Sequence, residues 1–493
     1  MSAPNNQLPA ILNVATIPTI NNMNIKTEVL DPITITNKQA VFMIPKTGIL
    51  DGGSMVQLGI TADPKNFFPL NTGIHGLIRS CFLKVGGKVI ASNDDYAYYT
   101  TMTRQFETPE HRAYVDMVKS GACGDRWAEV ESGRIGYRDL VATVNAGDPL
   151  LTNLVVPEFI RPTQSDATTP LFSVPLSTLI PMMRSRQLPL LAIKEHIYLE
   201  INFNEQAANQ QGTITCVQAT HNNLSAVKIS QPNIKFISDH LYYTNDQMDN
   251  VVRQTLSDQG LSILYEDLIT TYADVPAVNV VSGVVPQSIE RQIAVSGRTV
   301  RNILIQEKVL NQNHAVLGQY RSSDLVIPSQ YNFRINDQRI YDRNVQAPPR
   351  KYNEVAGVMG KPLMVPNQMY SYDVDSDKQD NPLQRLNQNS VYIGKIDGHQ
   401  MPNSTNTTGL DTNDLRNTSH YIGYDATTTG FNVLGNGAKI GVKPIIINRV
   451  YSRQANAAGP PQVIDQSAAR QMRIYTGVER VMVLKNGEIT LSA

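Results

Sequence analysis

The stretch LKVGGKVI at residues 83–90 has a counterpart half a chain length later, FRINDQRI at residues 333–340. Most columns of the two stretches keep their physical character, and the two central residues are Gly-Gly in the first stretch and Asn-Asp in the second. These residue types readily adopt the positive φ angles that a type I′ turn requires. We therefore predict a tight β-hairpin at both places.

Other strand patterns repeat in the same order along the two halves of the chain. AIKEHIYLEINF at 192–203 has a counterpart in AKIGVKPIIINRV at 438–450, and IKFISD at 234–239 resembles MRIYTG at 472–477. The members of each pair lie roughly 240–250 residues apart, and repeats at a fixed separation indicate a duplicated architecture. We therefore interpret the chain as two copies of one β-rich domain.

Alternation of apolar and polar residues indicates strands that are buried on one face. In KEHIYLEINF (194–203) the apolar residues from Ile197 to Phe203 fall on one face and the polar residues on the other. A period of two is typical of antiparallel sheets with one wetter face. Near the end of the chain, VMVLKNGEITL (481–491) places Asn-Gly between two such runs, which predicts a third hairpin.

Helical patterns are few and short. The three-to-four spacing of apolar residues predicts helices over 96–106 and 110–120 after the first hairpin, and over 348–359 after the second. A further helix is expected at 245–257, where the two halves meet. In both halves, then, a hairpin precedes a helix.

Charge and cysteine content exclude several classes of protein. The chain has 43 Lys and Arg against 43 Asp and Glu, whereas nucleic-acid-binding proteins normally carry a basic surplus, so we expect no direct contact with nucleic acid. Its three cysteines, Cys81, Cys123 and Cys216, are far apart and are expected to be buried thiols in a reducing compartment. The N-terminus does not resemble a signal peptide, and no run of about 20 apolar residues predicts a membrane span.

No pattern of catalytic or cofactor chemistry is found. The sequence contains no GxxxxGK[ST], GxGxxG, GxSxG or HExxH motif, and its eight histidines never stand three or four apart on one element. His196 is expected to be an ordinary residue of a polar strand face, and Asp94-Asp95 to cap a turn or a helix. We therefore predict no catalytic residue, no cofactor, no metal site and no enzymatic activity.

The first 25 residues contain no charged side chain, and two interpretations of them stay open. They are either a frayed terminus or an extended arm that lies along a neighbouring subunit or an accessory protein. In the second case the apolar contact residues would be Leu8, Ile11, Leu12, Val14 and Ile17. The predicted organisation is an arm over 1–25, a first domain over 26–240 and a second over 241–493.

The two hairpins with their following helices, LKVGGKVIASNDDYAYY and YNFRINDQRIYDRNVQAPPRKYNEV, resemble those of double jelly-roll major capsid proteins. The stretches LPLLAIKEHIYLEINF and IYTGVERVMVLKNGEITLS resemble that family too, and the likeness is greatest to polinton-like viruses and virophages, in the lineage of adenoviruses and large DNA viruses. The resemblance implies an all-β fold of two tandem eight-stranded antiparallel jelly rolls with a few short helices.

The same resemblance implies a function. The chain would be a major capsid protein of the virion that forms homotrimers with a pseudo-hexagonal outline, and these would tile an icosahedral shell. Long polar loops, the longest at 376–419, would form outer towers or clasp neighbours, while the arm would lie against minor capsid proteins or an internal membrane. The other partners would be penton proteins, and assembly would take place inside the host cell, without secretion.

Two alternatives share the β pattern. A carbohydrate-binding β-sandwich protein or cupin-like enzyme would need an aromatic platform or a metal cluster, and the sequence shows neither. A trimeric spike or fibre protein would show short tandem repeats or a slender shaft, whereas this chain shows one duplication of a large unit.

Overall fold

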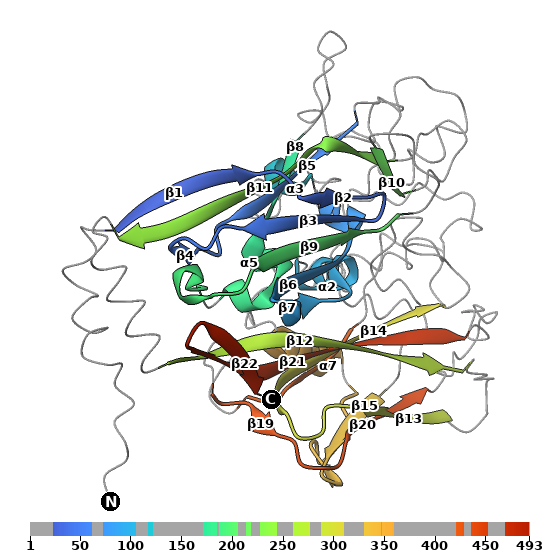
Figure 1. The fold of residues 1–493 in the computed structure, drawn as a ribbon. Coiled ribbons are helices and arrows are strands. Elements are labelled where there is room, and N and C mark those ends of the chain that lie inside the picture. Colours follow the sequence, from blue (N-terminus) through green and yellow to red (C-terminus); the bar gives the residue numbers. More distant parts are fainter. Residues whose placement is uncertain are drawn as a thin grey trace, which may run out of the picture.

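Four antiparallel sheets make up most of the described chain. The computed structural model describes residues 23–61, 72–104, 117–121, 171–184, 187–205, 213–217, 227–243, 260–276, 287–309, 330–346, 348–358, 421–427, 435–451 and 469–492. The sheets are numbered I to IV in the order in which Figure 1 shows them stacked, from the top of the view to the bottom. Sheets I and II come from the first half of the chain, and sheets III and IV from the second.

Sheet I has the strand order β1-β11-β5-β8, and sheet II the order β2-β3-β9-β6-β7. Two short strands, β4 and β10, also pair with β11. The strands of the first half are β1 (Met23–Leu30), β2 (Thr34–Ile35), β3 (Gln39–Ile44), β4 (Ile49–Leu50), β5 (Met55–Ile60), β6 (Ile78–Val85), β7 (Lys88–Asn93), β8 (Leu171–Pro175), β9 (Ile197–Phe203), β10 (Thr213–Val217) and β11 (Val227–Tyr243).

Sheet III has the strand order β12-β21-β14-β18, and sheet IV the order β13-β20-β15-β16. Strand β19 pairs with β14, and β22 with β21. The strands of the second half are β12 (Leu261–Val275), β13 (Gln287–Ile293), β14 (Thr299–Val309), β15 (Gln330–Ile335), β16 (Gln338–Arg339), β18 (Tyr421–Asp425), β19 (Ala438–Lys439), β20 (Ile445–Tyr451), β21 (Arg470–Lys485) and β22 (Glu488–Ser492).

Both halves have the same topology. In the described part of the chain, each half has eight main strands, which are all of its strands except the short β2, β4 and β10 in the first half and β19 and β22 in the second. Counted along the chain, the first, eighth, third and sixth main strands form one sheet, and the second, seventh, fourth and fifth form the other. Two packed sheets connected in this way are an eight-stranded jelly roll. The prediction of an all-β fold with two tandem jelly rolls is confirmed.

Each sequence repeat occupies equivalent places in the two jelly rolls. The first pair of stretches forms the hairpins β6-β7 and β15-β16, whose turns have φ angles of 54° and 84° at Gly86 and Gly87 and of 51° and 67° at Asn336 and Asp337. The second pair contains β9 and β20, and the third lies in β11 and β21. The third predicted hairpin joins β21 to β22. The duplication inferred from sequence is therefore a duplication of structure.

Each jelly roll encloses an apolar core between its two sheets. In β9, Ile197, Leu199, Ile201 and Phe203 are buried while the residues between them are half-buried, as the alternation predicts. A second core, which includes Val300, Phe333 and Ile447, lies between sheets III and IV. Burial of these side chains is the main contribution to the stability of each jelly roll.

Within the described ranges the helices are few and short, as predicted. They are α2 (Tyr96–Arg104), α3 (Met117–Ser120), α5 (Leu176–Leu179), α7 (Pro348–Val358) and the 3-10 helices η2 (Gly73–Leu77), η7 (Pro181–Arg184) and η8 (Leu190–Ala192). The helix predicted at 245–257 lies outside the described residues. No helix in the described part of the chain is long and apolar enough to cross a membrane.

The predicted domain limits stay predictions. Strand β11 of the first jelly roll ends at Tyr243, and β12 of the second begins at Leu261. Of the predicted arm, residues 1–22 lie outside the described residues, and Met23 to Ile25 belong to β1.

Two glycine substitutions test the turn chemistry. Gly86 has a positive φ, and a Cβ there would meet the carboxylate of Glu195, so Gly86→Ala is expected to lower the free energy of unfolding by about 1–2 kcal/mol. Gly357 in α7 has no atom within 4 Å of its would-be Cβ, so Gly357→Ala is expected to raise it by about 0.5–1 kcal/mol. Denaturant unfolding followed by circular dichroism measures both, and equal effects of the two variants would contradict the assigned turn.

Candidate functional site: the contact between the two jelly rolls

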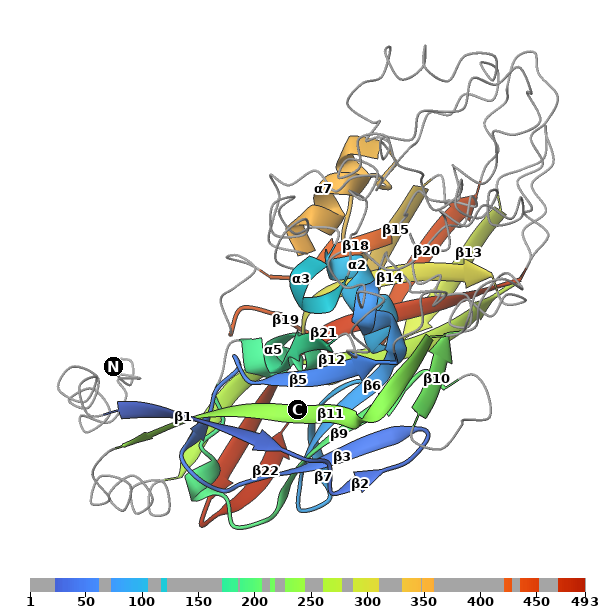
Figure 2. The same cartoon turned by 90° about the horizontal axis from the view of Figure 1, so that it is seen from above.

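Sheet III of the second jelly roll lies against the first jelly roll. Figures 1 and 2 show the long strands β12 and β21 next to β7 and the short helices of the first half. Strand β12 contacts both β7 and the 3-10 helix η7. The edge strand of sheet II and the helical segments around it therefore form the first jelly roll's side of the contact.

The contact has two apolar parts. In one part, Ala97, Tyr98, Tyr99 and Met102 of α2 form a buried cluster with side chains of sheet III and of α7. The residues from the second half are Leu268, Leu304, Val355, Ala356, Val358, Tyr421 and Tyr475. The outer face of sheet III is apolar here. Without α2 and α7, this apolar face would be exposed to water.

In the other part, one end of sheet III extends the core of the first jelly roll. Ile263 and Tyr265 of β12 and Met482 and Leu484 of β21 belong to the same buried cluster as the side chains between sheets I and II. Interfaces between domains that are large and apolar resist relative motion. We infer that the two jelly rolls move as one body.

An ion pair with a hydroxyl group is buried within this contact. Arg473 Nη1 and Tyr475 Oη of β21 both donate to Asp95 Oδ2, which precedes α2, at 2.6 and 2.7 Å. The guanidinium of Arg473 also lies 3.8 Å from the ring centroid of Tyr98. Burial raises the pKa of Tyr475 well above its ordinary value, and the negative charge of Asp95 adds to this effect. The tyrosine therefore stays protonated and serves as a hydrogen-bond donor.

A second polar group lies nearer to β7. Arg480 Nη1 donates to Asp267 Oδ2 at 2.5 Å, and the backbone N–H of Ser92 points to Asp267 Oδ1 at 3.4 Å. Tyr265 Oη donates to the carbonyl oxygen of Ile90 at 2.6 Å. Burial raises the pKa of Asp267, while Arg480 acts in the opposite direction. These bonds hold β12 in position against β7.

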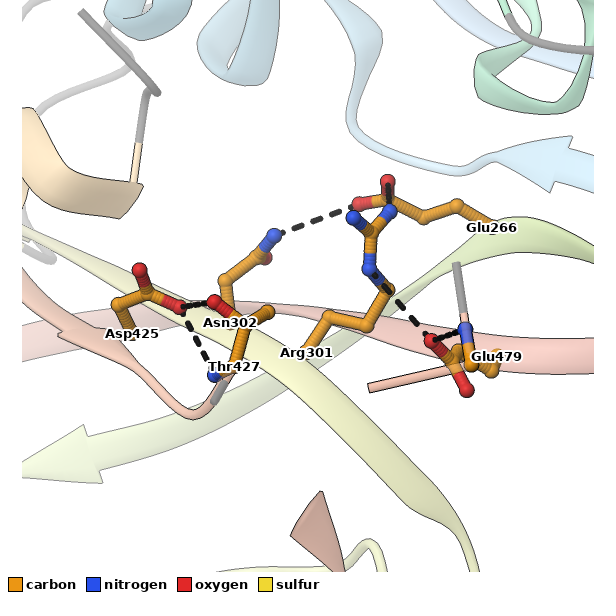
Figure 3. Close-up of polar contacts among 7 residues, drawn as sticks. Glu266, Arg301, Asn302, Asp425, Thr427 and Glu479 are labelled. Carbon is orange, nitrogen blue, oxygen red and sulfur yellow. Dashed lines mark hydrogen bonds and ion pairs between the residues drawn. The ribbon is translucent and has the colours of Figure 1, made fainter. Parts of the chain in front are cut away.

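A third polar group connects three strands of sheet III (Figure 3). The pairing of β14 with β21 shifts between Val300 and Asn302, so Arg301 is the extra residue of a β-bulge. Its buried guanidinium pairs with Glu266 of β12 and lies 3.7 Å from Glu479 Oε1 of β21. Asn302 Nδ2 donates to Glu266 Oε1 at 3.3 Å. The bulge thus directs a cation between two carboxylates.

This charged group is next to the first jelly roll. Figure 3 shows Glu266 and Arg301 on the side of sheet III where the pale blue and green ribbon of the first half lies. Burial is the main cause of the raised pKa of Tyr99 on α2, and the carboxylate of Glu266 contributes to it. The three polar groups together run along the same contact.

Of the histidines and cysteines that the structure describes outside this contact, all but His196 are buried in the first jelly roll. His75 is buried, with Nδ1 2.6 Å from Tyr96 Oη, and His240 bonds to the carbonyl oxygen of Thr47 and to Ser238. His196 is exposed at the start of β9. Within the described ranges, no three His, Cys, Asp or Glu side chains are placed to hold a metal ion. Cys81 and Cys216 are free and buried, and burial raises the pKa of both thiols.

The contact residues predicted for the arm are not part of this site. Leu8, Ile11, Leu12, Val14 and Ile17 lie outside the described residues, so their role stays a prediction.

Sequence reasoning missed the polar contacts between the halves. Asp95 precedes a helix as predicted, but its carboxylate bonds to residues of the second half. Asp95 and Arg473 are 378 residues apart, and no local pattern connects them. The one sequence signal for a contact between the halves is the repeat itself, because a hairpin and a helix recur at the same place in both jelly rolls.

Comparison with known proteins agrees with the fold. Residues 49–244 match the family model described as the major capsid protein N-terminus. No curated protein matches the sequence. The chain is similar to VP54 of PBCV-1, as fitted into a reconstruction of the virophage Sputnik, with 12% identity and a TM-score of 0.51, covering 96% of this chain and 97% of that one. It is also similar to a chain in the structure of the Sputnik virophage, with 11% identity and a TM-score of 0.51, covering 96% of this chain and 88% of that one. These two likenesses concern the fold.

Removal of the buried carboxylate tests the contact. Asp95→Ala leaves Arg473 and the hydroxyl of Tyr475 without this acceptor, and breaking a buried pair typically costs about 3–5 kcal/mol. The control is Glu290→Gln, because the pair of Glu290 with Arg334 on sheet IV is exposed and worth about 1 kcal/mol or less. Denaturant unfolding measures both. Equal losses for the two variants would show that Asp95 contributes no more than a surface charge.

The buried histidine predicts a pH dependence. Burial, with a smaller effect of Arg104, holds the pKa of His75 well below its ordinary value, so the unfolded chain binds the proton first as pH falls. Stability is therefore expected to decrease below about pH 6.5, by up to about 1.4 kcal/mol per pH unit. His75→Gln keeps a hydrogen-bonding side chain that does not titrate, and it should make the slope between pH 7 and 5 shallower. An unchanged slope would assign the effect to other groups.

Proposed function

We propose that this chain, which has a double jelly-roll fold, is a major capsid protein and that three copies associate into a capsomer that tiles an icosahedral shell. The chain forms the structural subunit of that shell. Six jelly rolls around one threefold axis would give the capsomer a pseudo-hexagonal outline.

The observation that carries the proposal is the buried contact between two jelly rolls of equal topology. Because α2 and β7 hold sheet III in one orientation, each chain is a stiff pair of similar blocks. Three such pairs can close a ring in which every block has nearly the same neighbours. A flexible connection between the jelly rolls would not define one capsomer shape.

A structural role is also supported by the family match of residues 49–244. We propose no catalytic activity. Neither a carbohydrate-binding sandwich nor a spike or fibre protein is favoured by that match.

The remaining partners belong to the proposal as well. Penton and minor capsid proteins, or an internal membrane, would contact the uncharged arm through Leu8, Ile11, Leu12, Val14 and Ile17. The equal numbers of basic and acidic residues support a shell protein that does not bind the genome directly. The virion is the site of function, and the buried free thiols Cys81 and Cys216 suit assembly inside the host cell without secretion.

The mass of the purified protein in solution tests the proposal. We expect a particle of three chains of 54.6 kDa each, with a hexagonal outline in negative-stain images of the same sample. A stable monomer that persists at high protein concentration would contradict the proposed function.

A further inference from the structure

A row of apolar side chains crosses the outer face of sheet I. Val29, Ile237, Met55 and Pro175 are consecutive partners across β1, β11, β5 and β8. Val29 is 64% exposed, and the other three are half-buried. We call these four residues the sheet I row.

The sheet I row points away from the core. The next residues along the same four strands, Leu30, Phe236, Val56 and Val174, all belong to or pack on the core of the first jelly roll. Because successive side chains of a strand point to opposite faces, the row lies on the outer face. Farther along the same face, beyond the polar pair of Thr27 and Asp239, Ile25 (68% exposed) is opposite Leu241.

The equivalent row of sheet III is covered. In the repeat, Ile237 of IKFISD corresponds to Tyr475 of MRIYTG, and the partners of Tyr475 are Thr270 and Leu304, with Gly423 beyond. Tyr475 and Leu304 are buried beneath α2 of the first jelly roll, in the contact described above.

Of the other two members of the sheet III row, Thr270, the counterpart of Val29, is half-buried and Gly423 is covered. A Cβ on Gly423 would lie 2.7 Å from the Cα of Val355, so helix α7 lies directly on this residue. Three of the four positions are thus closed in one jelly roll, whereas the row is open in the described part of the other.

The part of the first jelly roll that covers sheet III has a duplicate. The covering elements are the hairpin β6-β7 and α2, and the second jelly roll has the hairpin β15-β16 followed by α7 at the equivalent place. In the described part of one chain, no further sheet lies beyond that duplicate for it to cover. The contact is therefore head to tail, and among the described residues each chain keeps one uncovered sheet, sheet I, and one unused covering element, the hairpin β15-β16 with α7. Head-to-tail contacts between copies can close into rings.

We propose that the sheet I row is a subunit contact, covered in the assembly by the second jelly roll of another copy of this chain. The covering segment is the region from Gln338 to Val345 together with the exposed face of α7. This inference rests on the proposed trimer and names the surface that forms it.

The sheet I row is an apolar centre with charged residues beside it, and the covering segment has charged residues on it. The sheet I row is bordered by the ion pair of Lys235 with Asp31. The covering segment exposes the charged side chains of Arg339, Asp342 and Arg343. An apolar centre with a charged rim is typical of contacts that form between folded subunits.

Val29→Glu tests the proposal. A carboxylate at this end of the row would lie in the contact without a partner, so the concentration at which half of the trimers dissociate should rise by at least about tenfold. Met43→Glu is the matched control, because Met43 is 43% exposed on β3 of sheet II, outside the proposed contact, and this variant should remain trimeric. The masses of the wild type and both variants are compared at equal concentrations.

The outcomes separate this proposal from the proposed function. If the wild type is a monomer, the proposed function fails, and this contact with it. If the wild type and Val29→Glu are trimers of equal stability, the contact is wrong while the capsomer stands.

Cross-linking identifies what covers the row, including in the case that Val29→Glu does not fold. A photoreactive residue replaces Val29 in trimers assembled from light and heavy isotope-labelled chains. Cross-links to residues 338–358 of a different copy are expected. Cross-links to residues 1–22 of the same chain, or to no other copy, would overturn the proposal.

Discussion

The outer face of sheet III must be covered, and the first jelly roll covers it. This burial is the constraint on which the rest of the structure depends. Tyr475, Leu304 and Leu268 would otherwise present an apolar surface to water across several strands. Because α2 follows directly after the hairpin β6-β7, a tight turn set by two glycines determines where the covering helix begins. A local backbone preference thereby contributes to the orientation of two complete domains.

We infer that the buried ions in this contact contribute more to the specificity of the arrangement than to its stability. Replacing a buried ion pair by apolar side chains is often neutral, whereas removing one partner is costly. Asp95 can be satisfied only where Arg473 and Tyr475 both reach it, and Asp267 only where Arg480 and Ser92 do. If the first jelly roll were shifted along sheet III, most of the apolar burial would remain but these bonds would be lost. The polar groups therefore select one arrangement among several that hydrophobic contact alone would allow.

Short-range features of the fold could be predicted, and contacts between the halves could not. The turns at Gly86-Gly87 and Asn336-Asp337 and the alternation in β9 follow from local chemistry. Duplication extended these local predictions to a topology, because equivalent strands recur in order. Asp95 shows the limit of such reasoning, since its position before a helix suggested a cap while its partner Arg473 lies far away in sequence. The bulge at Arg301 likewise has no signature in the sequence, because the register shift depends on the paired strand.

The two equivalent rows differ in residue type, and this difference agrees with one row being buried when the chain folds and the other being exposed in the described part of the folded chain. The row with Tyr475 is closed when the chain folds, so it can carry a buried hydroxyl that needs Asp95 and a glycine on which α7 packs closely. The row with Val29 is open on the described chain, and a side chain that needed a buried partner would be unsatisfied until assembly. Aliphatic side chains avoid that cost in both states. Duplication followed by this divergence leaves one chain with a contact buried inside it and, at the equivalent place in its described part, an open apolar row.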